Sequence, residues 1–159
     1  MSNKRRGVLY WISAWWLVAA CIYIVSIEST PDFGADRTSH PLRWLVQLFT
    51  GPLSDATWQT IHYFMRKTFH FVGYGVQGLA WFRAWRMTLP DARLLAQAGL
   101  ALLGTALVAS CDEWHQTFLP NRTGSPWDVL LDCCGAAALI GMAWMYMRFF
   151  RRTRHNSGE

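Results

Sequence analysis

The feature that most constrains this chain is an apolar run near its N-terminus, from Val8 to Ile27, which contains no charged residue. About 20 such residues, wound as a helix, cross the roughly 30 Å hydrocarbon core of a bilayer with every backbone amide satisfied internally. Three further candidate spans follow at residues 69–85, 94–111 and 129–147. The first of these is the weakest by hydropathy, and the last is interrupted only by Asp132.

Composition supports the same class. A soluble domain of 159 residues rarely carries 10 Trp and 52% apolar residues with only 16% charged ones. Two apolar spans could instead form a buried hairpin in a soluble protein, but no amphipathic partner helices remain to cover them. We therefore predict an all-α, polytopic membrane four-helix bundle that forms a single domain over residues 1–159, with a basic tail at 148–159.

The basic residues predict the orientation, because Lys and Arg near helix ends favour the cytoplasmic side. With the N-terminus inside, the inner segments hold ten of the fifteen basic residues: Lys4, Arg5, Arg6, Arg83, Arg86, Arg93, Arg148, Arg151, Arg152 and Arg154. Both termini are therefore expected in the cytoplasm, and the first span is expected to be an uncleaved anchor because no Ala-x-Ala site follows it. Nucleic-acid binding is disfavoured, since these charges flank helix ends instead of covering one soluble face.

The first outer segment, residues 28–66, is too long for a plain connector. Residues Pro41 to Thr50 carry apolar side chains at helical spacing, which predicts a short amphipathic helix on the outer membrane surface. Ser54 is a candidate N-cap for a helix that continues into the second span and projects beyond the bilayer.

Cysteines and carboxylates give little support for a metal. None of the four cysteines forms a C-x-x-C pair, so a thiolate zinc site is not predicted. A bridge between Cys111 and Cys133 is an alternative to free buried thiols, which we prefer. A divalent ion held by Asp112, Glu113 and Asp128 has no recognised loop pattern behind it, so no metal or other cofactor is predicted.

Polar residues gather in three places on the predicted outer side. Lys67, His70, Tyr74 and Gln77 are spaced three, four and three apart, which aligns them on one helix face. That face is expected to point into the bundle. The alternative is that Lys67 extends to the lipid headgroups while His70 and Tyr74 bond neighbouring helices.

The second group follows the third span. Asp112 and Gln116 share a face if the helix continues for one more turn, and Glu113 lies beside them. Paired carboxylates near a histidine can supply an acid and a base, although they can equally form a solvated helix end. We expect His115 at the surface.

The third group precedes and enters the last span. Asp128, Asp132 and Gly135 are four and three apart on one helix face. An ionisable group inside the hydrocarbon zone persists mainly where it is paired, so Arg122, Lys67 or His70 should lie near Asp132. An ion pair that locks the bundle and a substrate site remain equal alternatives.

These residues resemble the VanZ-like family of small membrane proteins. The matching pattern is Asp112-Glu113-x-x-Gln116-x-Phe118-x-Pro120-x-Arg122-x-x-Ser125-x-x-Asp128-x-x-x-Asp132-x-x-Gly135, preceded by Lys67-x-x-His70-Phe71-x-x-Tyr74. The resemblance implies a multi-pass protein of the bacterial cytoplasmic membrane, whose namesake confers low-level resistance to the glycopeptide teicoplanin. It nominates ten site residues: Lys67, His70, Tyr74, Asp112, Glu113, Gln116, Arg122, Ser125, Asp128 and Asp132. The chain departs from the family where Arg66 replaces a frequent aspartate, where Asn121 replaces glycine and where Asp132 replaces a frequent asparagine.

The leading functional hypothesis is an envelope protein that binds, and in one version modifies, an anionic amphiphile or lipid-linked molecule at the outer leaflet. Lys67 and Arg122 would hold its head group, with Tyr74, Gln116 and Ser125 as further contacts. As an enzyme it would be a hydrolase or group transferase whose acid, base and orienting groups are His70, Asp112, Glu113, Asp128 and Asp132. The alternatives are a structural or partner-binding membrane protein whose polar cluster locks the bundle and, less well supported, a transporter.

Overall fold

The computed structural model describes residues 7–31, 35–119 and 122–156. Within these ranges every regular element is an α-helix: α1 (Val8–Glu28), α2 (Ala35–Thr50), α3 (Asp55–Thr88), α4 (Leu94–Gln116) and α5 (Pro126–Asn156). The all-α class is therefore confirmed. Expectations that concern Lys4, Arg5, Arg6, Pro120 and Asn121, or the side chains of Arg151, Arg152 and Arg154, lie outside the described residues.

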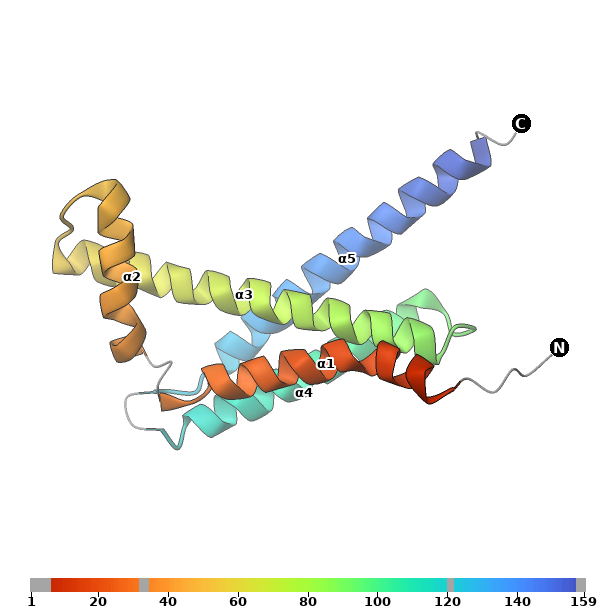
Figure 1. Ribbon diagram of the computed structural model, residues 1–159, viewed down its shortest axis with the longest axis horizontal. Coiled ribbons are helices and arrows are strands. Elements are labelled where there is room, and N and C mark those ends of the chain that lie inside the picture. The colour runs from red at the N-terminus through yellow and green to blue at the C-terminus, as the bar shows by residue number, and fades with distance from the viewer. Residues whose placement is uncertain (1–6, 32–34, 120–121, 157–159) are drawn as a thin grey trace.

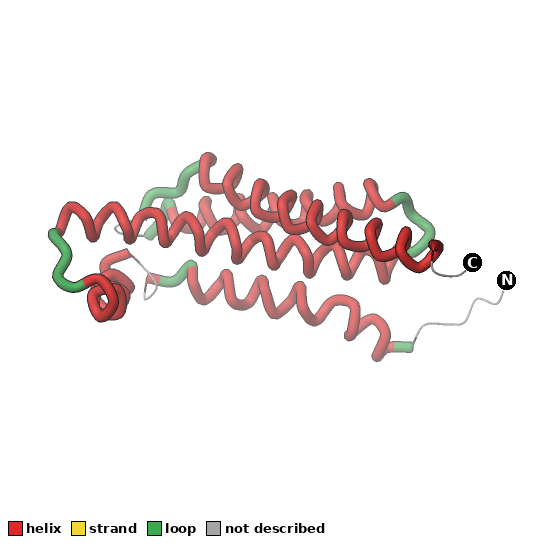
Figure 2. Tube along the Cα trace, turned by 90° about the horizontal axis from the view of Figure 1, so that it is seen from above, coloured by secondary structure: helices red, strands yellow, loops and turns green. Residues whose placement is uncertain are grey.

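Helix α3 is the centre of the molecule and contacts each of the other four helices. Helices α1, α3 and α4 run side by side, and α5 crosses α3 near the middle of both (Figures 1 and 2). The start of α1, the α3–α4 connection and the last turns of α5 all lie at one end (Figure 1). We call the opposite end, where α1 and α4 finish and α5 begins, the outer end, after the orientation predicted from the basic residues.

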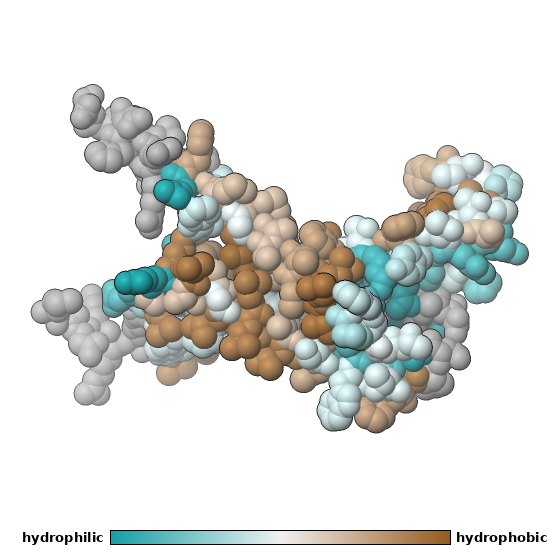
Figure 3. Space-filling model, turned by 180° about the vertical axis from the view of Figure 1, so that it is seen from behind, coloured by the Kyte–Doolittle hydropathy of each residue, from teal (hydrophilic) through white to brown (hydrophobic). Residues whose placement is uncertain are grey.

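In the described part of the chain, three helices are long and apolar enough to cross a membrane: α1, α4 and residues Pro126–Phe149 of α5. Their surfaces form a hydrophobic band in the middle of the molecule, with hydrophilic residues toward its ends (Figure 3). Helix α3 is not among the three, because polar side chains such as His70, Tyr74 and Gln77 lower its hydropathy. The described chain thus has the helices of a membrane protein, while the span at 69–85, the four-helix bundle and the cytoplasmic termini stay predictions.

Glycines bring α3 and α5 into close contact. A Cβ atom added to Gly135 would lie 2.9 Å from the carbonyl carbon of Phe71, and one added to Gly78 would lie 3.0 Å from the Cα of Ala136. Gly75 meets Leu139 and the carbonyl oxygen of Gly135 in the same way. Small residues at a crossing allow backbones to approach as they do in other membrane helix pairs.

Helix α2 begins six residues before the expected start at Pro41, so that proline lies inside the helix. The expectation was wrong at this boundary because a proline removes only one backbone donor and does not always mark a first turn. The helix runs across the bundle direction in both views (Figures 1 and 2).

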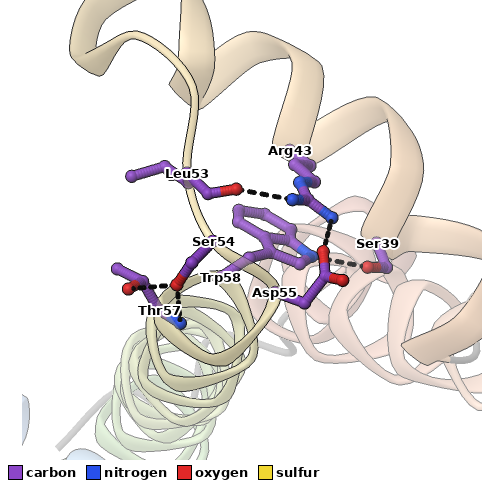
Figure 4. Close-up of polar contacts among 7 residues, drawn as sticks. All are labelled: Ser39, Arg43, Leu53, Ser54, Asp55, Thr57 and Trp58. Carbon is purple, nitrogen blue, oxygen red and sulfur yellow. Dashed lines mark hydrogen bonds and ion pairs between the residues drawn. The ribbon is translucent and has the colours of Figure 1, made fainter.

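Three polar contacts hold α2 against the start of α3 (Figure 4). The guanidinium of Arg43 pairs with Asp55 at 2.7 Å and donates to the carbonyl oxygen of Leu53 at 2.7 Å. The indole of Trp58 donates to the Ser39 hydroxyl at 2.7 Å. Ser54 accepts from the backbone N–H of Thr57 at 3.2 Å, which confirms it as the N-cap of α3. Because of these contacts, the outer segment has a defined structure of its own.

Helix α3 runs without a break over 34 residues. At about 1.5 Å per residue it is roughly 51 Å long, well beyond the roughly 30 Å hydrocarbon core. The expected continuation from Ser54 into the second candidate span is confirmed. The four cysteines are all free, as preferred from the sequence, but the expectation that they are buried was wrong, because Cys111 and Cys134 are exposed and Cys21 and Cys133 are partly exposed.

Candidate functional site

The buried polar side chains of the outer end come from three helices that meet at the α3–α5 crossing. Helix α3 contributes Lys67, His70 and Tyr74 on one face, helix α4 contributes its last turn, and helix α5 contributes its first two turns. The three polar groups expected from the sequence are therefore brought together.

Two successive contacts join α3 to α5. Lys67 donates to a carboxylate oxygen of Asp128 in a short ion pair. One turn further into the bundle, Nδ1 of His70 lies 3.4 Å from Oδ1 of Asp132. The expectation that one of three basic residues lies near Asp132 is met by His70, whereas Lys67 takes Asp128 as its partner.

Asp132 is fully buried, with 0% of its surface exposed. Neither of its carboxylate oxygens has a hydrogen-bond partner in the described part of the chain, and its contact with His70 lacks hydrogen-bond geometry. A buried carboxylate without donors is costly in a low-dielectric interior. The site therefore contains acceptors that its own residues leave unsatisfied.

Asp112 joins α4 to α3. Its Oδ2 atom accepts hydrogen bonds from the Tyr74 hydroxyl and from the side-chain amide of Gln116, both at 3.0 Å. The predicted shared face of Asp112 and Gln116 is confirmed, because α4 does continue to residue 116. His115 points outward as expected, and its Nδ1 lies 3.0 Å from the hydroxyl of Ser29.

Glu113 is held by the segment that leads into α5. Its Oε2 atom accepts the backbone N–H of Ser125 at 2.7 Å. The preceding Gly124 passes so close to α4 that an added Cβ would overlap the carbonyl group of Glu113. Ser125 therefore contacts the cluster through its backbone, while its hydroxyl accepts from the N–H of Trp127 at 3.3 Å.

Arg122 lies at the rim of the cluster. It donates to the carbonyl oxygens of Glu28 at 3.1 Å and of Thr30 at 3.4 Å. Burial and the neighbouring Arg66 lower the pKa of the Arg122 guanidinium from its ordinary value. The group still carries its charge, since arginine is not deprotonated in proteins.

A cavity of about 540 Å³ opens beside these residues, between α1, α2, α3 and the last turn of α4. Five of the ten nominated side chains line it: His70, Tyr74, Asp112, Gln116 and Arg122. The remaining five, Lys67, Glu113, Ser125, Asp128 and Asp132, do not line it.

The cavity walls also include residues that were not nominated. Arg66 and Glu28 add charge at the outer end, and Gln77 closes the inner end. Arg66 was visible in the sequence as a departure from the family pattern, and Gln77 as a member of the polar stripe. Glu28 gave no signal beyond its place at the end of a span.

Comparison with known proteins assigns the sequence to one family. No curated protein and no solved structure matches the chain. The sequence model of one family, described as VanZ/LLP1, matches residues 8–151, which is nearly the whole chain and includes every side chain of the cluster. The chain is therefore a member of the VanZ/LLP1 family.

Proposed function

We propose that the protein binds an anionic amphiphile at the outer leaflet of a bacterial cytoplasmic membrane. The head group would lie at the outer end of the cavity, beside Arg66 and Arg122, and the tail would lie along the wall toward the bundle centre. The observation that carries this proposal is the division of the cavity lining into an apolar wall and a charged end, where two arginines lie with Glu28 and Asp112.

The apolar wall suits a lipid tail because it faces outward. Its members Ile24, Phe69, Val72 and Val76 are each about half exposed, at 52%, 58%, 49% and 49%. In a bilayer such side chains contact acyl chains, so a tail can enter sideways without crossing a polar barrier. A groove closed on all sides would not offer this route.

The two arginines at the charged end suit a phosphate or carboxylate head group. Arginine offers planar, bidentate hydrogen bonds to either group, and two arginines lie at this end of the cavity. Candidate ligands are a phospholipid, a lipid-linked cell-wall precursor and the acyl-bearing glycopeptide teicoplanin. The last of these would connect the cavity to the resistance associated with the family's namesake.

Native mass spectrometry of the purified protein tests this proposal. The wild-type chain should retain one lipid-sized molecule, and Arg122→Gln should reduce the retained fraction at least fivefold. Arg93→Gln is the matched control, because Arg93 is an exposed residue at the opposite end of the molecule. Retention of nothing by the wild type, or equal retention by Arg122→Gln, would exclude this binding site.

A catalytic version of the proposal uses the same cluster. Asp112, Glu113 and His70 provide candidate acid and base groups for hydrolysis or group transfer at the head group, with Asp128 and Asp132 as orienting residues. Glu113→Gln should then leave abundance and lipid retention normal while turnover of the retained molecule stops.

A second candidate is a structural role in which the cluster locks the bundle. It is favoured by the contacts of Lys67 with Asp128 and of Tyr74 with Asp112, each of which joins two helices. Under this reading, Asp132→Asn should chiefly lower abundance in the membrane. Quantitative immunoblotting of membranes separates the two candidates, since normal abundance with lost function supports the first.

A further inference from the structure

The residues behind the cavity form a second site of different chemistry. His70, Glu113 and Asp132 each offer a ligand atom, and these atoms lie within 4.8 Å of one another. The three groups come from α3, α4 and α5, so the point where they meet is fixed by the packing of three long helices. From this geometry we infer that the protein holds one divalent transition-metal ion, zinc or manganese, between His70, Glu113 and Asp132.

Unsatisfied acceptors are the first argument. Both carboxylate oxygens of Asp132, Oε1 of Glu113 and Nδ1 of His70 are buried without a hydrogen-bond partner among the described residues. Asp132 is 0% exposed and Glu113 is 4% exposed. One ligand atom from each of the three residues converges here, and acceptors that lack a hydrogen bond keep lone pairs free for an ion, as a preformed metal site does.

The second argument is distance. Bond lengths of about 2.0–2.2 Å place neighbouring ligand atoms of a tetrahedral zinc ion roughly 3.4 Å apart. The observed separation between His70 Nδ1 and Asp132 Oδ1 is 3.4 Å. The carboxylate oxygen that Glu113 offers lies within 4.8 Å of the other two ligand atoms, and the backbone N–H of Ser125 holds Oε2 of this carboxylate in place.

The third argument is charge. Glu113 and Asp132 place two carboxylates in the buried interior, where unpaired charge is expensive. Lys67 is paired with Asp128 and Arg122 donates to carbonyl oxygens at the end of α1, so the basic group left beside these carboxylates is His70. A divalent ion would neutralise both carboxylates. Zinc or manganese suits a ligand set of one imidazole nitrogen and two carboxylate oxygens better than Mg²⁺ or Ca²⁺ does.

The ion would have an open coordination position toward the cavity, since His70 both lines the cavity and belongs to the metal group. Three protein ligands with a free fourth position are typical of zinc sites that bind a water or a substrate oxygen. The inference goes beyond lipid binding, and either can hold without the other.

Metal loading of the detergent-solubilised full chain tests the inference. The protein is purified without a polyhistidine tag, stripped with EDTA, dialysed against Zn²⁺ or Mn²⁺ and analysed by inductively coupled plasma mass spectrometry. One ion per chain is expected, and Co²⁺ loading should give the intense visible absorption bands of a low-symmetry four-coordinate site.

Substitutions locate the ion. Glu113→Gln and His70→Gln should each weaken metal binding at least tenfold, and both should elute as the wild type does in size-exclusion chromatography. Asp91→Asn is the control, because Asp91 is an exposed carboxylate in the α3–α4 connection at the opposite end of the molecule (Figure 1), and this variant should keep one ion per chain. A metal-free wild type after loading, or full loading of both ligand variants, would overturn the inference. Lipid retention is measured on the same samples, so failure of the metal site is distinguishable from failure of the lipid proposal.

Discussion

The tight crossing of α3 and α5 makes Gly135→Ala a sharp test of the fold. The added Cβ would lie 2.9 Å from the carbonyl carbon of Phe71 and 3.1 Å from its Cα, whereas ordinary contact begins at 3.4 Å. Because the atoms it meets, the carbonyl oxygen of Phe71 nearest of all, belong to the backbone, no side-chain rotation relieves the overlap, and the two helices must move apart. Overpacking of this kind costs roughly 1–3 kcal/mol.

Gly141→Ala is the matched control on the same helix, because nothing lies within 4 Å of a Cβ at that position. Each substitution gains about 0.5–1 kcal/mol of helix propensity, which cancels in the comparison and leaves the overlap as the difference. Thermal unfolding in detergent, followed by tryptophan fluorescence, should place Tm of Gly135→Ala below that of Gly141→Ala by roughly 2–12 °C. Equal midpoints would refute the close approach of α3 to α5.

Three further measurements address other parts of the structure. In a double-mutant cycle on thermal unfolding, Lys67→Met and Asp128→Asn should show a favourable coupling of about 1–3 kcal/mol. The reason is that each single change leaves a partly buried charge without its partner. Additive effects of the two substitutions on the free energy of unfolding would contradict the pairing. Burial, together with a nearby arginine, lowers the pKa of His62, so the folded state prefers the neutral imidazole. The stability of the outer segment should therefore fall as pH drops through about 6.5 toward the lower folded-state pKa. Limited proteolysis at pH 8 and pH 5 should show this loss of stability, and His62→Phe should remove the difference. Gly124→Ala should push the chain before α5 away from the carbonyl group of Glu113 and accelerate exchange of the amide at residue 125, as measured by hydrogen exchange; unchanged protection would argue against that contact.

Local patterns in the sequence predicted the parts of the site that lie on a single helix. Asp112 and Gln116 are four residues apart, and helical geometry alone places them on one face. The stripe of Lys67, His70 and Tyr74 follows the same rule and does face the other helices. Such relations depend on the helical repeat and not on the rest of the fold.

Relations between helices could not be predicted in the same way. Asp132 was expected near any of three basic residues, and the choice of His70 depends on where α5 crosses α3, which Gly135 fixes through backbone contact. Arg122 was one of the three residues expected near Asp132, but it donates to carbonyl oxygens at the end of α1, a segment more than 90 residues away in the chain. Spacing within one segment carries no information about such distant contacts.

The unbroken length of α3 has a mechanical consequence. The helix contains no proline, so its outer part, which carries α2 through Trp58, and its inner part, which ends beside Arg86, behave as one stiff rod. A displacement of α2 would therefore be transmitted along this rod to the opposite end of the molecule. His70 sits partway along it and would move with it.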